Sequence, residues 1–381
     1  MKQKLPSYKD IRHVGEKRIV LLLDLNVPMH GNTIVDSFRI EKSIPTLKYF
    51  SSRKAKIVVI SHLGSDGTRS LLPIAHYLQK KKLPVRFVPR VTGDTVREAL
   101  FSLAPGEILL LENIRVEAGE KKNDPVLARE LALYGEVFVN DAFSVSHRAH
   151  ASVVGIPEYL PAYAGPLFMK EVSELSKAIH PKHPFVFILC GAKFETKLPL
   201  LTKYLKKADT VFVGGALANN LIKLEGFEVG RSLVDSEAKL PTSILRNKKL
   251  ILPVDVIIEG GRTKSKEVIW KSDRIVDIGP KTVSYLGKLL SRAELVLWNG
   301  PLGVYEEGYD GATLHLLNLL AKTKATSIIG GGDTAAIVMK HHLEKKFTFV
   351  STAGGAALEF LAKETLPGIE ALCKKNNFRF F

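Results

Sequence analysis

The sequence has few cysteines and lacks long apolar segments, the features typical of small disulfide-linked secreted domains and of membrane proteins. Its two cysteines, Cys190 and Cys373, lie far apart in 381 residues and give neither a disulfide framework nor a zinc-binding spacing. No apolar run approaches membrane-spanning length, and residues 1–18 lack the apolar core of a signal peptide. No segment is of low complexity. We therefore expect a globular, cytoplasmic protein with no membrane partner.

Acidic residues are scarce relative to basic ones. There are 39 Asp and Glu against 55 Lys and Arg, which gives a formal net charge of +16. Such an excess favours anionic partners: nucleic acid, an acidic membrane or polyanionic small molecules. No zinc finger or RNP-like motif supports nucleic-acid binding, and basic runs such as residues 80–82 are typical of a solvated surface. Small anions are therefore the partners we expect, rather than nucleic acid.

Short apolar runs alternate with amphipathic helical stretches along the chain. Continuous apolar runs of strand length predict strands buried on both faces, as in a parallel sheet. Helical patterns cover residues 39–50, 71–82, 125–133 and 335–345. The alternation predicts an α/β fold, and 381 residues are long for one domain. We expect two doubly wound parallel-sheet domains joined by a helical hinge.

Prolines mark the predicted domain boundary. Pro157, Pro161 and Pro166 punctuate a turn-rich stretch, and MKEVSELSKAI then has the pattern of one amphipathic helix. The last residues, after Leu366–Gly368, are expected to be short and irregular. The predicted divisions are residues 1–165, 166–180 as the interdomain helix, 181–365, and a C-terminal segment, 366–381.

The apolar runs of the two halves end differently. In the first half they lead into polar clusters such as DLN, SHLG, ENIR and NDAF, whereas in the second half they lead into glycines. Ligands of parallel α/β sheets bind beyond the carboxyl ends of the strands. Two different ligands are therefore expected, one held by charged side chains and one by glycine-rich loops.

The polar clusters of the first half form a candidate anion site. Arginine forks match phosphate and carboxylate groups, and several of these residues fall near one edge of the predicted sheet. Any one of them alone is as easily a turn former or a surface charge. His147 and His150 are interpreted as structural, because no third metal ligand lies nearby in the sequence. The candidates are Asp24, Asn26, Arg39, His62, Arg115 and Arg148.

The segment SIIGGGDTAAIVMKHH predicts a strand, a glycine turn and a helix. Gly330, Gly331 and Gly332 would let the backbone approach a ligand, and the helix N-terminus would attract an anion. A tight structural turn explains the glycines equally well. Asp333 beside a bound phosphate would be repulsive without a cation, which favours Mg²⁺, although an N-cap role is the alternative.

Two lysines follow another predicted strand. Lys193 and Lys197 in CGAKFETK would share one face of a helix and could neutralise phosphate charge. Lysine pairs are common on exposed helices, so this pair indicates a phosphate site only in combination with the neighbouring motifs. The sequence has no G-x-x-x-x-G-K-[ST] motif, which excludes a P-loop protein.

Taken in order, these motifs resemble phosphoglycerate kinase. The resemblance runs from about Arg18 to Leu372. It implies reversible phosphoryl transfer between ATP and 3-phosphoglycerate, giving 1,3-bisphosphoglycerate and ADP, by a monomer that uses Mg²⁺. The motifs are DLNVP, SHLG, LLLENIR, NDAF-x-x-x-HRAHAS, GAK-x-x-x-K, LPVD, WNGP-x-GV-x-E, GGGDT and LPGIEAL.

The resemblance also implies a role for each motif residue. The six anion-site candidates would hold phosphoglycerate in the N-terminal domain, and residues 370–381 would return to that domain. Arg39 and Lys193 would stabilise the transferring phosphoryl group once the domains close, and Asp333 would hold Mg²⁺. The nucleotide would be bound by Gly191, Ala192, Lys197, Asn299, Glu306, Gly331, Gly332, Asp333 and Thr334, with Asn299 and Glu306 by the ribose.

The chain departs from the family pattern at three places. The family usually continues SHLG with Arg-Pro, where this sequence has Ser65 and Asp66. Its GGAK is CGAK here, and its STGGGA is STAGGA, with Ala353 at a glycine position that would be strained at positive φ. Two alternatives stay open: a paralogue that binds these ligands without turnover, and a basic protein whose main ligand is nucleic acid.

Overall fold

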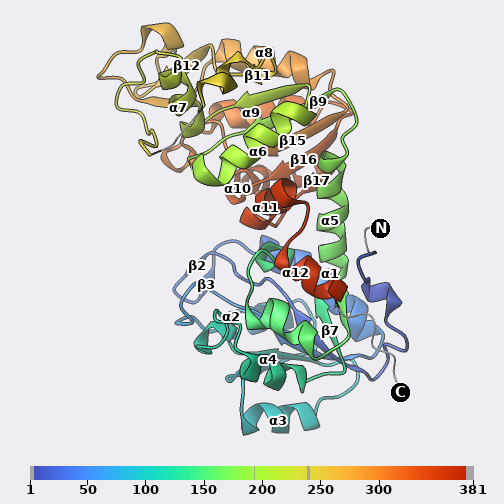
Figure 1. The fold of residues 1–381 in the computed structure, drawn as a ribbon. Helices are drawn as coiled ribbons and strands as arrows, with labels where there is room; N and C mark the ends of the chain where they lie inside the picture. The colour runs from blue at the N-terminus through green and yellow to red at the C-terminus, as the bar shows by residue number, and fades with distance from the viewer. Residues whose placement is uncertain (1–3, 193, 238–240, 375–381) are drawn as a thin grey trace. The chain divides into compact units, whose positions relative to one another are not determined.

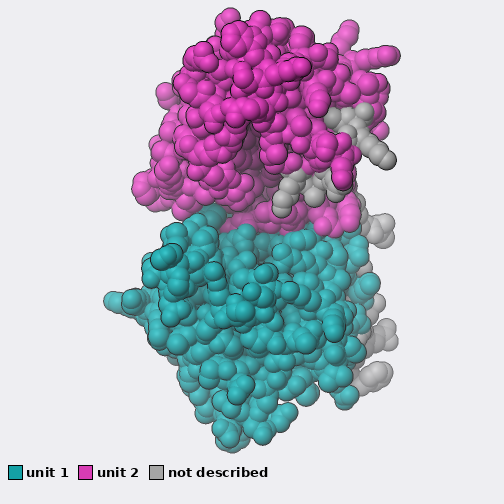
Figure 2. Space-filling model, turned by 90° about the vertical axis from the view of Figure 1, so that its left-hand side faces the viewer, with its two compact units in different colours: residues 1–173, 365–381 teal, residues 174–364 magenta. Residues whose placement is uncertain are grey.

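The computed structural model describes residues 4–192, 194–237 and 241–374. The chain forms two compact units, Met1–Ser173 with Thr365–Phe381 and Glu174–Glu364 (Figure 2). Each unit contains one six-stranded sheet with helices packed on it (Figure 1). The helix α5 (Pro166–Ile179) contains the boundary between the units. The predicted α/β fold of two parallel-sheet domains with a helical hinge is confirmed.

The sheet of the first unit is parallel throughout. Its central strand β1 buries Ile19 to Leu22 on both faces, each at most 2% exposed. Burial on both faces explains why the sequence shows a continuous apolar run instead of an alternating one. The strands in sheet order are β5 (Val85–Val88), β6 (Ile108–Leu111), β4 (Lys56–Ile60), β1 (Arg18–Leu22), β7 (Val137–Asn140) and β8 (Ala162–Ala164).

The helices of the first unit cover the predicted stretches. Those expected over residues 39–50, 71–82 and 125–133 are confirmed, with ends that shift by up to two residues. A small hairpin pairs β2 (Met29–His30) with β3 (Thr33–Ile34). The helices are α1 (Phe38–Ser52), α2 (Leu72–Lys80), α3 (Asp94–Phe101) and α4 (Pro125–Ala132), with short turns η1 (Tyr8–Asp10), η2 (Ile114–Val116), η3 (Phe143–Val145), η4 (Ala151–Gly155) and η5 (Ile156–Glu158).

The C-terminal segment is helical, so the expectation of an irregular end is wrong for its described part. Helix α12 (Pro367–Lys374) begins at a proline, which suits the first position of a helix. The Gly368 amide donates to the Ser146 carbonyl at 2.8 Å, and a Cβ on Gly368 would lie 2.6 Å from the Ser146 Cβ. Only glycine permits this contact, which ties α12 to the first unit. Residues 375–381, part of the segment expected to return, lie outside the described residues.

The second unit repeats the parallel six-stranded plan. A separate antiparallel sheet of β13 (Thr263–Ser265), β12 (Asp255–Ile258) and β14 (Ile275–Ile278) lies beside the pocket described below. The strands of the main sheet, in order, are β11 (Leu250–Ile251), β10 (Thr210–Val213), β9 (Phe185–Leu189), β15 (Leu295–Asn299), β16 (Thr326–Gly330) and β17 (Phe349–Val350).

The helix predicted over residues 335–345 is α10 (Gly332–Lys340), which ends earlier than expected. His342 has a positive φ of 53°, a conformation that terminates the helix. None of the described helices could cross a membrane. The other helices are α6 (Phe194–Lys207), α7 (Ala216–Leu224), α8 (Pro280–Leu290), α9 (Gly311–Leu320) and α11 (Gly355–Lys363), with short turns η6 (Thr242–Arg246), η7 (Lys266–Val268), η8 (Tyr305–Glu307) and η9 (Glu344–Lys346).

The first turn of α5 is capped by a buried carboxyl group from the end of β7. Asp141 accepts a hydrogen bond from the Phe168 amide at 2.9 Å and another from the Thr46 hydroxyl of α1. Burial raises the pKa of Asp141 to about 7, although these hydrogen bonds oppose the shift. The start of the hinge helix is thus fixed to the sheet and to α1.

Candidate functional site

In the first unit, the polar residues that follow β1 are bonded to the start of α1. Arg39 donates from Nη1 to Asp24 Oδ2 at 2.7 Å and to the Asn26 carbonyl at 3.3 Å. Asn26 Oδ1 accepts from the Gly64 amide at 2.9 Å, which links this group to the loop after β4. The structure therefore brings Asp24, Asn26 and Arg39 together, as the sequence predicted.

His62 is the buried centre of the same cluster. Burial, together with the charges of Arg115, Arg148 and Arg39, lowers its pKa to about 4, against the opposing effect of Asp24. These mutual effects mean that residues from four different segments of the chain lie within electrostatic reach of one imidazole. His62 is consequently neutral near pH 7 and can donate one hydrogen bond to an anion without adding charge.

The cluster carries more positive than negative charge. Burial lowers the pKa of Arg115, and the charge of the neighbouring Arg148 adds to this effect, against the opposing charge of Glu120. Burial alone would raise the pKa of Asp24, but Arg39, His62 and hydrogen bonds outweigh it and keep the carboxylate ionised. A small ligand with phosphate and carboxylate groups would balance this excess of positive charge, because guanidinium forks bind both groups bidentately.

Ser144 belongs to this cluster, although no sequence motif singled it out. Its hydroxyl donates to Asp24 Oδ2, so the carboxylate is held from both sides, by Ser144 and by Arg39. Ser144 lies between the recognisable motifs NDAF and HRAHAS. Only its place on η3, after β7, brings it to Asp24.

The histidines considered for metal binding have other partners. His150 Nδ1 lies 3.7 Å from Glu120 Oε1, and Glu120 also accepts hydrogen bonds from the amide and hydroxyl of Ser152, at 2.9 and 2.6 Å. His147 Nε2 accepts from Arg148 Nε at 3.3 Å. Among the residues that the structure describes, no group of three His, Cys, Asp or Glu side chains could hold a metal ion.

The departure at residues 65–66 forms a self-bonded surface turn. Asp66 Oδ1 accepts from the Thr68 amide at 3.1 Å and from its hydroxyl at 2.9 Å, and these bonds lower the pKa of Asp66. The Arg69 carbonyl accepts from Asn113 Nδ2 at 2.8 Å. Asp66 is thus occupied within its own loop.

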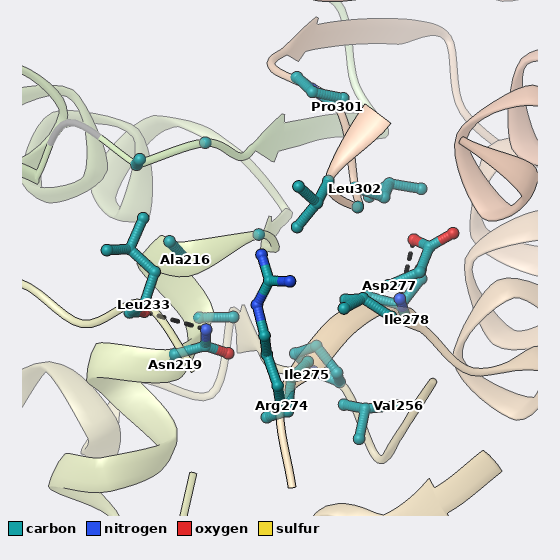
Figure 3. A pocket seen from close by; sticks show the side chains of 18 of the residues that line it. Ala216, Asn219, Leu233, Val256, Arg274, Ile275, Asp277, Ile278, Pro301 and Leu302 are labelled. Atoms are coloured by element: carbon teal, nitrogen blue, oxygen red, sulfur yellow. Dashed lines mark hydrogen bonds between the residues drawn. The ribbon is translucent and has the colours of Figure 1, made fainter. Parts of the chain in front are cut away.

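The second unit contains a cavity of about 360 Å³, a size typical of small-molecule pockets (Figure 3). Its walls come from the loop after β9, the start of α7, the strand β14 and the loop after β15. Most of the lining is apolar. The predicted residues that line it are Gly191, Ala192, Glu306 and Asp333.

The glycine loop leads into α10 beside this pocket. Gly331 has a φ of 90°, and the position of a Cβ on Gly332 meets no atom within 4 Å. Open space before a helix N-terminus suits an approaching phosphate. The hydroxyl of Thr334 is buried and, among the described residues, has no hydrogen-bond partner.

Asp333 lies in the first turn of α10. The N-cap position belongs to Gly331 and shows no side-chain capping bond, so the N-cap alternative for Asp333 is wrong. The Tyr305 hydroxyl donates to Asp333 Oδ1 at 3.3 Å, and burial together with Asp333 raises the pKa of Tyr305 to about 12. Asp333 therefore presents a carboxylate at a helix end that favours anions, an arrangement that suits a bridging cation.

The remaining predicted nucleotide residues lie close to the glycine loops. Lys197 is buried in α6, and its Nζ donates to the Cys190 carbonyl just before Gly191. Asn299 ends β15, and its amide lies 3.4 Å from the Cβ position of Gly331. Lys193 lies outside the described residues, and α6 begins just after it.

The departure at Ala353 causes no backbone strain. Ala353 is not among the described residues with positive φ; the positive value, 55°, belongs to Gly354, which precedes α11. The Ala353 amide donates to Ser351 Oγ at 3.1 Å. The conformation that would penalise alanine is therefore taken by its neighbour.

A cationic cluster in one α/β unit and a glycine-lined pocket at a helix N-terminus in the other are typical of a nucleotide-dependent phosphotransferase. A family model described as "Phosphoglycerate kinase" matches residues 8–364. The phosphoglycerate kinase of Pseudothermotoga lettingae is 42% identical over 97% of this chain and 98% of its own length, and that of Thermosipho africanus is 41% identical over 97% and 98%.

Comparison with solved structures leads to the same family. Phosphoglycerate kinase from Coxiella burnetii matches with a TM-score of 0.83 and 36% identity, over 97% of this chain and 99% of its own. The Pyrococcus horikoshii enzyme matches with a TM-score of 0.87 and 29% identity, over 97% and 98%. This chain belongs to the phosphoglycerate kinase family.

Proposed function

We infer that this chain carries out the reaction of its family, the reversible transfer of a phosphoryl group between ATP and the carboxylate of 3-phosphoglycerate in glycolysis. The products are 1,3-bisphosphoglycerate and ADP. The observation that carries this conclusion is the family match over residues 8–364. The cationic cluster and the glycine-lined pocket, built from the motif residues themselves, support it.

Steady-state turnover with ATP, Mg²⁺ and 3-phosphoglycerate tests the inference. Binding of both substrates without turnover would identify the chain as a paralogue that has lost catalysis. Strongly salt-dependent association with DNA or RNA, without kinase activity, would favour nucleic-acid binding.

The first unit would bind phosphoglycerate. Its phosphate and carboxylate would be held by the arginines around His62, and its hydroxyl would meet the ionised Asp24. The proposal is supported by the mutual contacts of these residues and by the excess of cations among them. The proposed ligands are Asp24, Asn26, Arg39, His62, Arg115 and Arg148.

Catalysis would depend on aligning the two substrates and neutralising the charge of the transferring group, without a covalent enzyme intermediate. In-line phosphoryl transfer needs the attacking and leaving oxygens to be aligned and the moving charge to be neutralised. Arg39 from the first unit and Lys193 from the second would supply this charge once the domains close around both substrates. In this proposal the interdomain segment, residues 166–180, separates domains of residues 1–165 and 181–365, with the C-terminal segment 366–381 returning to the first.

The second unit would bind the nucleotide together with Mg²⁺. The residues fit this group: Asp333 lines the pocket, the Thr334 hydroxyl lacks a partner among the described residues, and the space before Gly332 is open. Mg²⁺, when bound, would neutralise phosphate charge beside Asp333. The proposed nucleotide contacts are Gly191, Ala192, Lys197, Asn299, Glu306, Gly331, Gly332 and Thr334.

We further propose a cytoplasmic monomer. The absence of a membrane-spanning helix among the described residues and the two unpaired cysteines, Cys190 and Cys373, are compatible with it. Sedimentation analysis would test the oligomeric state.

A further inference from the structure

An arginine side chain runs through the nucleotide pocket. Arg274 immediately precedes β14 and lines the cavity. Figure 3 shows its side chain extending through the middle of the pocket, with Leu233 on one side and Asp277 and Ile278 on the other. None of the sequence motifs drew attention to it.

The guanidinium of Arg274 is fixed in its plane. Nη1 and Nη2 form a fork with the Glu307 carboxylate, at 2.8 and 2.6 Å, and Nη1 also lies 3.4 Å from Glu259 Oε1. A bidentate pair sets the orientation of the whole planar group. The hydrogen bonds with Glu307, and then its charge, raise the pKa of Arg274. The hydrogen bonds recorded for Arg274 all lie in the plane of the guanidinium, at Nη1 and Nη2.

This arrangement is suited to a flat aromatic group better than to a phosphate. Two carboxylates already neutralise the charge of Arg274, so little attraction remains for a phosphate. The wall around it is apolar and includes Leu233, Ile275 and Val304. If the phosphates lie at Asp333 and the start of α10, the base of the nucleotide falls in this apolar part of the pocket.

We propose that Arg274 stacks on the nucleobase of the bound nucleotide, and that Glu307 is the positioning residue that holds its plane. The inference rests on the proposed nucleotide role of this pocket and adds to it the contact that binds the base. An arginine face stacks on any base, and a purine offers the larger surface. Arg274 would therefore favour purine over pyrimidine nucleotides without separating adenine from guanine.

The test compares binding of two polyphosphate anions, one that carries a nucleoside and one that does not. Calorimetric titration of the parent chain and of Arg274→Ala with ADP and with inorganic tripolyphosphate separates stacking from charge. We expect Arg274→Ala to weaken ADP binding about tenfold and to leave tripolyphosphate binding unchanged. The Michaelis constant for ATP should rise similarly with kcat unchanged, because stacking is equal in the ground and transition states.

Three variants serve as comparisons. Arg231→Ala is the matched control, because Arg231 also pairs with Glu259, at 2.9 Å, but does not line the pocket; its ADP affinity should equal the parent's. Arg274→Lys keeps the charge without the flat face and should resemble Arg274→Ala. Glu307→Gln loosens the fork and should give a smaller loss of ADP affinity, again without a change in kcat.

Four results would overturn the proposal. Parent-like ADP affinity in Arg274→Ala would exclude stacking. An equal loss for tripolyphosphate, or full rescue by Arg274→Lys, would assign Arg274 to phosphate charge. Failure of the parent chain to bind ADP at all would overturn the inference together with the proposed function, and is distinguished from the others because the parent itself fails.

Discussion

The two units differ in the groups that they offer to an anionic ligand. The first presents side chains: Asp24, Arg39 and His62 contact or influence one another closely enough to shift their pKa values. The second presents mainly backbone, with glycines at the pocket and at the start of α10. Each unit nevertheless places its site beyond the carboxyl ends of parallel strands, where α/β sheets bind ligands.

The difference predicts how each site responds to mutation. A side-chain site concentrates charge in few groups, so removing one group changes both affinity and chemistry. A backbone site depends on open space, so the damaging change there is the addition of atoms rather than their removal. The cation crowding around His62 also predicts that the first site is less stable without its ligand than with it.

The largest effect is expected from Arg39→Ala. Turnover should fall on the order of 10²–10³-fold, the usual cost of losing one donor to developing charge, while phosphoglycerate affinity changes less. Steady-state kinetics with both substrates saturating measures it. Arg53→Ala, at the exposed end of the same helix, where the guanidinium lies 3.7 Å from the Tyr49 ring, should retain parent-like turnover. Near-normal turnover in Arg39→Ala would remove Arg39 from the mechanism.

The second-largest effect on activity is expected from Asp333→Asn. Asparagine keeps the size of the side chain and can still accept from the Tyr305 hydroxyl, but it loses the charge that attracts a cation. We expect activity to require several-fold more Mg²⁺, with phosphoglycerate binding intact. Activity is titrated against Mg²⁺ at fixed ATP for both proteins. Superimposable curves would contradict a metal role.

Gly332→Ala tests the backbone site by adding one methyl group. No described atom lies within 4 Å of the new Cβ and φ is not positive, so the fold should tolerate alanine. The methyl would occupy the space in which phosphates approach, so the Michaelis constant for ATP should rise a few-fold at unchanged melting temperature. Gly311→Ala, at the first position of α9 with equally open surroundings, is the control. An unchanged Michaelis constant in Gly332→Ala would place the phosphates elsewhere.

The smallest effect concerns the pH dependence of stability. The pKa of His62 and that of His150 are both about 4 in the folded chain, against about 6.5 when unfolded. The unfolded chain therefore takes up protons first as pH falls from about 6.5 to about 4, and stability is lost across that window. Urea unfolding of parent and His62→Gln at several pH values measures this. A pH dependence as steep in the variant as in the parent would contradict the assignment.

Much of the fold could be predicted because buried parallel strands leave uninterrupted apolar runs. Many of the predicted site residues, such as Asp24, His62 and Asn299, lie at or just after the ends of those runs, where motif and topology coincide. Ser144 and Arg274 could not be predicted, because their contacts depend on which segments meet in space rather than on a local pattern. Helix α12 was missed because its short amphipathic pattern becomes stable through the contact of Gly368 with Ser146.

The carboxyl group of Asp141, which caps the start of α5, changes how the stability of the first unit depends on pH. The pKa of Asp141 is about 7 in the folded chain, so between about pH 4 and 7 folding retains a proton that the unfolded chain has released. Acidification over this range favours the folded state through Asp141 and disfavours it through His62 and His150. The titration of the carboxyl group therefore offsets part of the loss caused by the two histidines. The net stability of the first unit should change less with acidity than the two histidines alone would dictate.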